Sequence, residues 1–226
     1  MDCSGEDKAP STPLSRNELL KRAGAFGAAA AVPAVLAPDD ARAEGELADL
    51  RQIRALSPRE AQTIAAVCER LIPSDSTGPG AREAKVARYI DRALAGDLRA
   101  FRPAYTAALL ALDSYARAKH GAAFAALPAD KQDAVLTDMD LNRATPSSFV
   151  PNGKAVFEMF RTHAVQGMFG DPKHGGNVNF VGWKLVRFPG PRLVISARDQ
   201  RINVTPKSSL KSAYSIPLFK NAGRRN

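Results

Sequence analysis

"LSPREAQTIAAVCERLIP", residues 56–73, is the stretch of sequence that decides the fold. Ser57 precedes Pro58, and Glu60 follows Ser57 by three residues, an arrangement typical of a capping box at a helix N-terminus. Apolar side chains then recur at the i, i+3, i+4, i+7 spacing of one helix face: Ala61, Ile64, Ala65, Cys68, Leu71 and Ile72. Pro73 ends the pattern, so the stretch predicts an amphipathic helix with one buried face.

Further stretches of the chain repeat this amphipathic spacing. They are residues 82–94, 98–121, 127–139 and 152–169. Gly96 suits a left-handed cap after the first of them, and Pro103 marks the true start of the second, which is the longest. The longest run of alternating polarity, "RLVIS" at residues 192–196, is short. The chain is therefore predicted to be mostly α: a compact helical bundle of about five helices, with an irregular glycine-rich loop, an extended C-terminal arm and little strand.

The first 43 residues have the pattern of an export signal. Basic residues precede the small, apolar run "AGAFGAAAAVPAVLA" at residues 23–37, and the Ala-Arg-Ala at residues 41–43 matches an A-x-A cleavage site. The apolar run is shorter than the roughly 20 residues that a membrane-spanning helix needs. "SRNELLK", residues 15–21, is similar to the twin-arginine export motif S-R-R-x-F-L-K, with Asn17 at the second arginine. We therefore expect a degenerate twin-arginine signal over residues 1–43 and a periplasmic, exported protein.

The chain after the signal divides by composition. We expect a linker at residues 44–55, the helical domain at residues 56–191 and a basic extended arm at residues 192–226. The formal net charge is +9, and residues 187–226 hold nine Lys or Arg against the single acid Asp199. This asymmetry argues against a protein that coats nucleic acid, and it indicates a basic arm on a nearly neutral body.

The motifs of several cofactor-carrying classes are missing from the sequence. There is no G-x-G-x-x-G for a dinucleotide, no C-x-x-C-H for haem, no H-E-x-x-H for a metal ion and no G-x-S-x-G for a hydrolase nucleophile. Loss of Cys3 with the signal leaves Cys68 alone, which excludes an internal disulfide and a thiolate-bound iron–sulfur cluster. Its helical spacing predicts a buried structural thiol. We expect no cofactor, no metal ion and no catalytic residue in this chain.

"GMFGDPKHGGNVNFVGW", residues 167–183, predicts a tight and defined loop. Glycines adopt positive φ at little cost, and the loop contains three in its middle: Gly170, Gly175 and Gly176. Pro172 fixes its own φ and pushes Asp171 toward extended backbone. We call residues 167–183 the glycine loop.

Polar and aromatic side chains in and near the glycine loop are the candidate site. His174 and Asn177 are expected to project polar groups, and Trp183 offers an apolar face with one N–H donor, an anchor that interfaces favour. A loop that packs on its own helices, with Asn177 closing a turn, is the competing interpretation. His163, on the buried side of the preceding helix, is expected to be a hydrogen-bonded core histidine.

Two blocks of the sequence resemble a known family. They are residues 56–91, "LSPREAQTIAAVCERLIPSDSTGPGAREAKVARYID", and residues 167–190, "GMFGDPKHGGNVNFVGWKLVRFPG". Over residues 56–189 the chain resembles the small subunit, called subunit 3 or gamma, of the gluconate 2-dehydrogenase type of membrane-associated flavin dehydrogenases.

The resemblance implies an accessory subunit whose partner is a large flavoprotein of the glucose–methanol–choline (GMC) oxidoreductase type. That partner binds FAD and oxidises sugars, sugar acids or glycosides. In such complexes the small subunit is similar to an escort that helps the flavoprotein to mature and to cross the membrane, sometimes with a cytochrome c subunit as electron acceptor. Peripheral membrane association would then come through the complex.

The C-terminal arm places apolar residues among basic ones, as in Tyr214, Ile216 and Phe219. A solvated tail, an arm that orders along a partner and an arm that meets membrane headgroups all fit this composition. We expect the partner interface to use Asp171, Pro172, His174, Gly175, Gly176, Asn177, Trp183, Tyr214, Ile216 and Phe219, with Tyr89 and Phe101 as secondary contacts.

These features predict a non-catalytic small subunit of a periplasmic, FAD-dependent sugar or glycoside dehydrogenase complex. Two other functions stay open. One is a stand-alone enzyme that uses His174 on a sugar, which would show turnover without a flavoprotein. The other is a periplasmic binding protein, which would remain monomeric beside a co-expressed flavoprotein.

Overall fold

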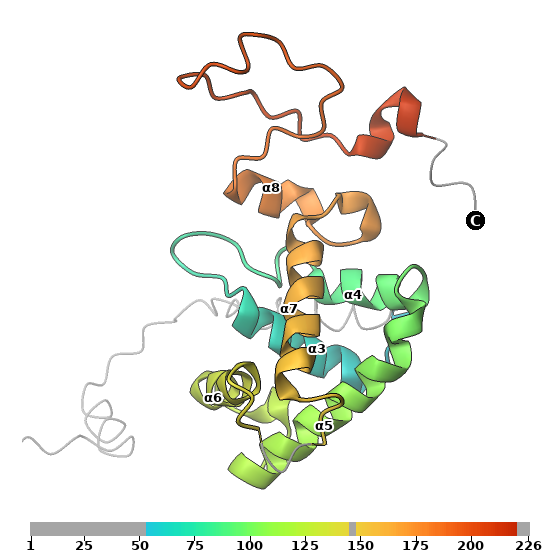
Figure 1. Cartoon of the computed structure of the whole chain (residues 1–226), viewed down its shortest axis with the longest axis vertical. Helices are drawn as coiled ribbons and strands as arrows, with labels where there is room; N and C mark the ends of the chain where they lie inside the picture. Colours follow the sequence, from blue (N-terminus) through green and yellow to red (C-terminus); the bar gives the residue numbers. More distant parts are fainter. Residues whose placement is uncertain (1–52, 145–147, 221–226) are drawn as a thin grey trace, which may run out of the picture. The chain divides into compact units, whose positions relative to one another are not determined.

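The chain folds as an arrangement of α-helices. The computed structural model describes residues 53–144 and 148–220, and within them it contains no β-strand. The α-helices in these ranges are α3 (Pro58–Leu71), α4 (Val86–Ala95), α5 (Arg102–His120), α6 (Ala129–Asp140), α7 (Gly153–Phe169) and α8 (Val181–Leu185) (Figure 1). The 3-10 turns are η1 (Arg99–Phe101), η2 (Phe124–Ala126), η3 (Pro172–His174), η4 (Val178–Phe180), η5 (Ala213–Ser215) and η6 (Pro217–Phe219). The prediction of a mostly helical protein is confirmed.

Some of the predicted features lie outside the described residues. These are the export signal at residues 1–43, the linker up to residue 52 and residues 221–226 of the arm. In the described ranges, no helix combines the length and the apolar character that crossing a membrane requires.

Helix α3 begins with the capping box that its sequence predicts. The Glu60 amide donates to Ser57 Oγ at 3.3 Å, and the Ser57 amide donates to Glu60 Oε2 at 2.8 Å. These two bonds satisfy amide groups that a helix N-terminus otherwise leaves without an acceptor. The helix contacts α4, α5, α6 and α7, so its apolar face lies at the centre of the core.

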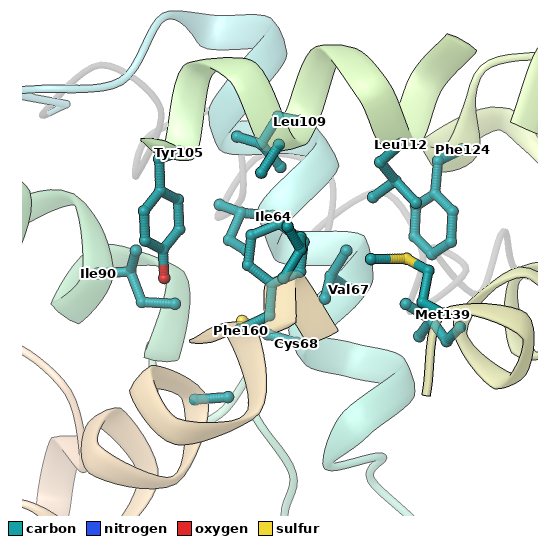
Figure 2. Packing of buried hydrophobic residues seen from close by; sticks show 14 of the residues in the cluster. Ile64, Val67, Cys68, Ile90, Tyr105, Leu109, Leu112, Phe124, Met139 and Phe160 are labelled. Atoms are coloured by element: carbon teal, nitrogen blue, oxygen red, sulfur yellow. The ribbon is translucent and has the colours of Figure 1, made fainter. Parts of the chain in front are cut away.

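The core is built around that face, as Figure 2 shows for buried side chains from several helices. Ile64 and Val67 of α3 are fully buried, as are Ile90 of α4 and Phe160 of α7. Cys68 is buried beside them, and desolvation raises the pKa of its thiol to about 12. The prediction of a structural thiol is confirmed, because a thiol with so high a pKa forms little thiolate at neutral pH.

Helices α5 and α7 begin close to where the sequence predicts. Helix α5 carries Pro103 in its first turn and ends at His120, and the cap residue Gly121 follows with a φ of 81°. Helix α7 is capped by Asn152, whose side-chain oxygen accepts from the Ala155 amide at 2.9 Å. Because these signals are local, they identify the helix ends without knowledge of the tertiary contacts.

The start of α4 and the cap after it differ from the prediction. The helix begins at Val86 instead of residue 82, after Lys85 in left-handed backbone with a φ of 58°. The Ala81 amide donates to the Ile72 carbonyl at 2.8 Å, so the chain is held against the end of α3 and turns before the helix starts. The expectation of a left-handed Gly96 is wrong, because its φ is −130°.

A buried carboxylate joins α4 to the segment before α3. Asp91 is 2% exposed and accepts the backbone amides of Arg54, Ala55 and Leu56 at 2.8 to 2.9 Å. This segment has no regular backbone ladder of its own, so Asp91 supplies the acceptors that its amides need.

His163 is the hydrogen-bonded core histidine that the sequence predicts. Its Nδ1 lies 2.8 Å from the Tyr105 hydroxyl, and its ring stacks on Tyr105 with 5.7 Å between centroids. The ring edge of Phe101 covers it from another side. His163 is 6% exposed, and desolvation lowers the pKa of its imidazole.

We expect this burial to make folding stability depend on pH. Because the pKa of His163 is lowered in the folded chain, the unfolded chain binds a proton more readily. The stability is fully present above the unfolded pKa of about 6.5 and is lost as the pH falls toward the folded value. Urea unfolding at about pH 7.5 and about pH 5.5 should differ less in His163→Gln than in the wild type. If the pH dependence of stability were unchanged in His163→Gln, burial of this imidazole would not be its cause.

Candidate functional site

The glycine loop lies against the last turns of α7 at backbone contact distance. A Cβ on Gly176 would lie 2.2 Å from the Gly167 carbonyl oxygen, and a Cβ on Gly182 would lie 2.0 Å from that of Met168. Neither contact is sterically allowed, so both positions require glycine. Gly175 has a φ of 104°, which also favours glycine.

Asn177 holds the two ends of the glycine loop together. Its side-chain amide donates to the Gly170 carbonyl at 2.8 Å, and its side-chain oxygen accepts from the Gly182 amide at 2.9 Å. The residue is fully buried. The interpretation in which Asn177 closes a turn is confirmed, and the expectation that it projects a polar group from the loop is wrong.

Trp183 is also directed into the chain. It is 6% exposed, and its indole N–H donates to the Phe169 carbonyl at 2.8 Å. The rings of Phe180 and Phe188 pack on it at centroid distances of 5.3 and 4.9 Å. The expectation of an offered apolar face is therefore corrected: neighbouring aromatic residues cover the indole, and Trp183 acts on the loop by fixing its shape.

The glycine loop and the C-terminal arm meet at Asp171. This carboxylate accepts from Ser212 Oγ at 2.7 Å and from the Ala213 amide at 2.8 Å, and it also accepts from the Lys173 amide at 3.0 Å. Two segments about 40 residues apart are thereby tied to one side chain. The carboxylate makes charge-assisted hydrogen bonds, which are stronger than neutral ones.

Tyr214 completes this junction. Its hydroxyl lies 3.3 Å from His174 Nε2, and Lys173 Nζ lies 3.5 Å from the centroid of its ring. The ammonium over the ring face is a cation–π contact. We call the six residues that join the two segments the arm brace: Asp171, Lys173, His174, Ser212, Ala213 and Tyr214.

The arm brace predicts that Asp171→Ala frees the arm. The substitution removes the acceptor for Ser212 and Ala213 while α3 to α7 keep their contacts. We expect the arm to be cleaved at least about 10-fold faster in limited proteolysis, because the loss of about 1.5 to 3 kcal/mol of charge-assisted bonds populates its detached state. Asp97→Ala is the control at an exposed aspartate. Equal cleavage rates in the two variants would show that the brace does not hold the arm.

The remaining residues of the predicted site lie outside the arm brace. Pro172 opens η3, and the Gly175 carbonyl accepts from Arg88 Nε at 2.9 Å. Ile216 and Phe219 follow the arm brace and are partly buried. Of the secondary candidates, Tyr89 donates its hydroxyl to Gln166 at 3.0 Å, and Phe101 is 44% exposed.

The structure adds residues that the sequence analysis did not single out. Lys173 and Ser212 belong to the arm brace, and Ser212 had a local signal, because its hydroxyl accepts from the Tyr214 amide two residues later at 3.1 Å. Large apolar side chains are exposed nearer the start of the arm, at Leu193, Val194, Ile195 and Ile202. Across the described ranges, no three His, Cys, Asp or Glu side chains converge in a way that could hold a metal ion.

Fold and site together define a small helical protein whose C-terminal arm is braced against a glycine loop. The family model described as gluconate 2-dehydrogenase subunit 3 matches residues 58–190, which is more than half of the chain. The chain belongs to this family, and it is thereby a small subunit of a dehydrogenase complex with a catalytic partner subunit. The comparison with curated proteins and the comparison with solved structures gave no match.

Proposed function

We propose that this chain is the non-catalytic small subunit of a periplasmic, FAD-dependent sugar or glycoside dehydrogenase. Its partner is a large flavoprotein of the GMC type, which holds the FAD and performs the oxidation. The small subunit supports the maturation, export and stability of the flavoprotein.

The observation that carries the proposal is the family match over residues 58–190, which includes the glycine loop. The glycine loop is fixed by Asn177 and Trp183 and holds the arm through the arm brace. A surface that is already ordered loses little conformational freedom when it binds, which favours affinity. The excess of basic residues in the arm favours fast docking on an acidic surface.

Purification of the tagged full chain from its source cells tests the proposal. We expect a flavoprotein of larger size to co-elute, with FAD absorbance and sugar-dependent reduction of an artificial acceptor. The chain expressed alone should show no turnover. A monomer with its own turnover would overturn the proposal in favour of a stand-alone enzyme, and a monomer that binds sugar without a flavoprotein would favour a binding protein.

Co-expression in the source cells separates the escort role from simple complex formation. The flavoprotein is expressed with and without the small-subunit gene, and FAD-containing enzyme is measured in the periplasmic fraction. We expect active flavoprotein in the periplasm only when both genes are present. Equal amounts of active periplasmic flavoprotein in both strains would remove the escort role.

A further inference from the structure

The segment after α8 exposes apolar side chains that nothing in the described chain covers. Val194 is 82% exposed and Ile202 is fully exposed, and Leu193 and Ile195 are 58% and 60% exposed. Between α8 and η5 the chain traces an open loop without helices (Figure 1). We call residues 191–207 the apolar loop. Scattered apolar residues are common on protein surfaces, but four large aliphatic side chains in one short loop indicate a binding surface.

Hydrogen bonds close the base of the apolar loop. Arg192 donates to the Lys207 carbonyl at 2.9 Å, which joins the two ends of the loop. Next to it, the Ser209 amide donates to the Pro189 carbonyl at 3.0 Å. The arm brace then fixes the chain again at Ser212. The loop is therefore held at its base, while its apolar side chains face solvent.

The charge around these side chains is positive. Residues 187–220 contain seven Lys or Arg and the single acid Asp199. Asp199 is engaged within the loop, because its carboxylate pairs with Arg192 at 3.2 Å and accepts from Ser196 Oγ at 2.9 Å. Arg198 and Arg201, one residue before and two residues after Asp199, are solvent-exposed and can meet negative charge on a binding partner.

We propose that the apolar loop docks into an apolar groove rimmed by carboxylates on the catalytic subunit of the complex. The inference rests on the proposed function and adds a binding surface to it. The loop lies beyond residue 190, where the family match ends, so it gives this chain a contact outside the part that its family shares. Aliphatic side chains supply the buried area, and the flanking arginines orient the loop and speed its encounter with the partner.

The test compares two sets of substitutions at exposed apolar positions. The loop variant carries Leu193→Gln, Val194→Gln, Ile195→Gln and Ile202→Gln. The control variant carries Leu110→Gln and Leu141→Gln, which are 59% and 54% exposed on the helical domain. Because all six positions are solvent-exposed, both variants should keep the wild-type circular dichroism and thermal midpoint.

The probe is the FAD-containing subunit isolated from the complex with the wild-type chain. We expect the loop variant to bind it at least about 100-fold more weakly, the scale expected when a central cluster of contacts is lost. The control variant should bind like the wild type. Equal binding by the loop variant would overturn the docking of the apolar loop and leave the proposed function intact. A wild-type chain that retains no flavoprotein would overturn the proposed function itself.

The same variants also test two other binding partners for the apolar loop. Flotation with phosphatidylglycerol vesicles tests a lipid surface, and sedimentation tests a second copy of the chain. One combination of results would overturn the docking proposal. In it, the wild type floats or dimerises but the loop variant does not, while both chains bind the flavoprotein equally. We expect neither flotation nor dimerisation to depend on the four loop residues.

Discussion

Gly182→Ala is expected to detach the glycine loop from α7 and to release the arm with it. The added Cβ would lie 2.0 Å from the Met168 carbonyl oxygen, and this backbone atom in the last turn of α7 yields less readily than the end of a flexible side chain. The loop must move instead, and Asn177 then loses the Gly182 amide that it accepts from. We expect a loss of about 3 kcal/mol in the free energy of unfolding, near the upper end for overpacked sites. Urea unfolding measures this loss, and limited proteolysis of the arm reports the release.

Gly153→Ala, at the start of α7, is the control. A Cβ at this position would lie 3.4 Å from Met139 Cα and 3.5 Å from Ala144 Cβ, both ordinary contact distances. We expect the free energy of unfolding to change by less than about 0.5 kcal/mol or to rise slightly. If the two alanine variants lost equal stability, the close approach of the glycine loop to α7 would not be the cause.

Local signals predicted the helices of this chain well. The capping box of α3, Pro103 in α5 and Gly121 after α5 act within a few residues, so the sequence alone locates these ends. The start of α4 was misplaced because it depends on a bond between the Ala81 amide and the Ile72 carbonyl. That bond forms only after α3 has ended and the chain has turned back, and no periodic pattern reports it.

The sequence identified the residues of the candidate site, but it did not predict which way their side chains point. Unusual composition marked the glycine loop as specific, yet it could not say that Asn177 and Trp183 face the chain's own interior. Their acceptors are the carbonyls of Gly170 and Phe169, and backbone groups carry no sequence signal. The contact of Asp171 with Ser212 spans 41 residues, so only the folded chain shows that the two predicted segments meet.

The exposed residues of the apolar loop illustrate a different limit. "RLVIS", residues 192–196, alternates weakly, as a half-buried strand would, but a strand needs a neighbouring strand to pair with. The described residues offer none, and the segment runs as an open loop. An apolar segment that packs against nothing in its own chain is explained if it packs against another subunit. The exposed arm and the family membership therefore support the same proposed function.

Asp91→Ala is expected to be the most destabilising change on the helical domain that leaves the hydrophobic core intact. It removes the acceptor of three amides, those of Arg54, Ala55 and Leu56, and the last of these bonds is fully buried. A buried donor left without an acceptor costs about 1 to 3 kcal/mol. The amides of Arg54 and Ala55 are only partly buried, so water can reach them. We therefore expect a loss of about 3 to 5 kcal/mol in the free energy of unfolding, with new protease cleavage just before α3.

Two comparisons make the Asp91 prediction specific. Asp91→Asn keeps one side-chain oxygen, so it should retain part of the bonding and lose about half as much stability as the alanine variant. Asp97→Ala, at an exposed aspartate just after α4, should change the free energy of unfolding by less than about 0.5 kcal/mol. Because the segment held by Asp91 directly precedes α3, its release should also loosen the capping box of the helix that contacts α4, α5, α6 and α7. If Asp91→Ala were as stable as Asp97→Ala, the buried carboxylate would not be what fixes the entry to the core.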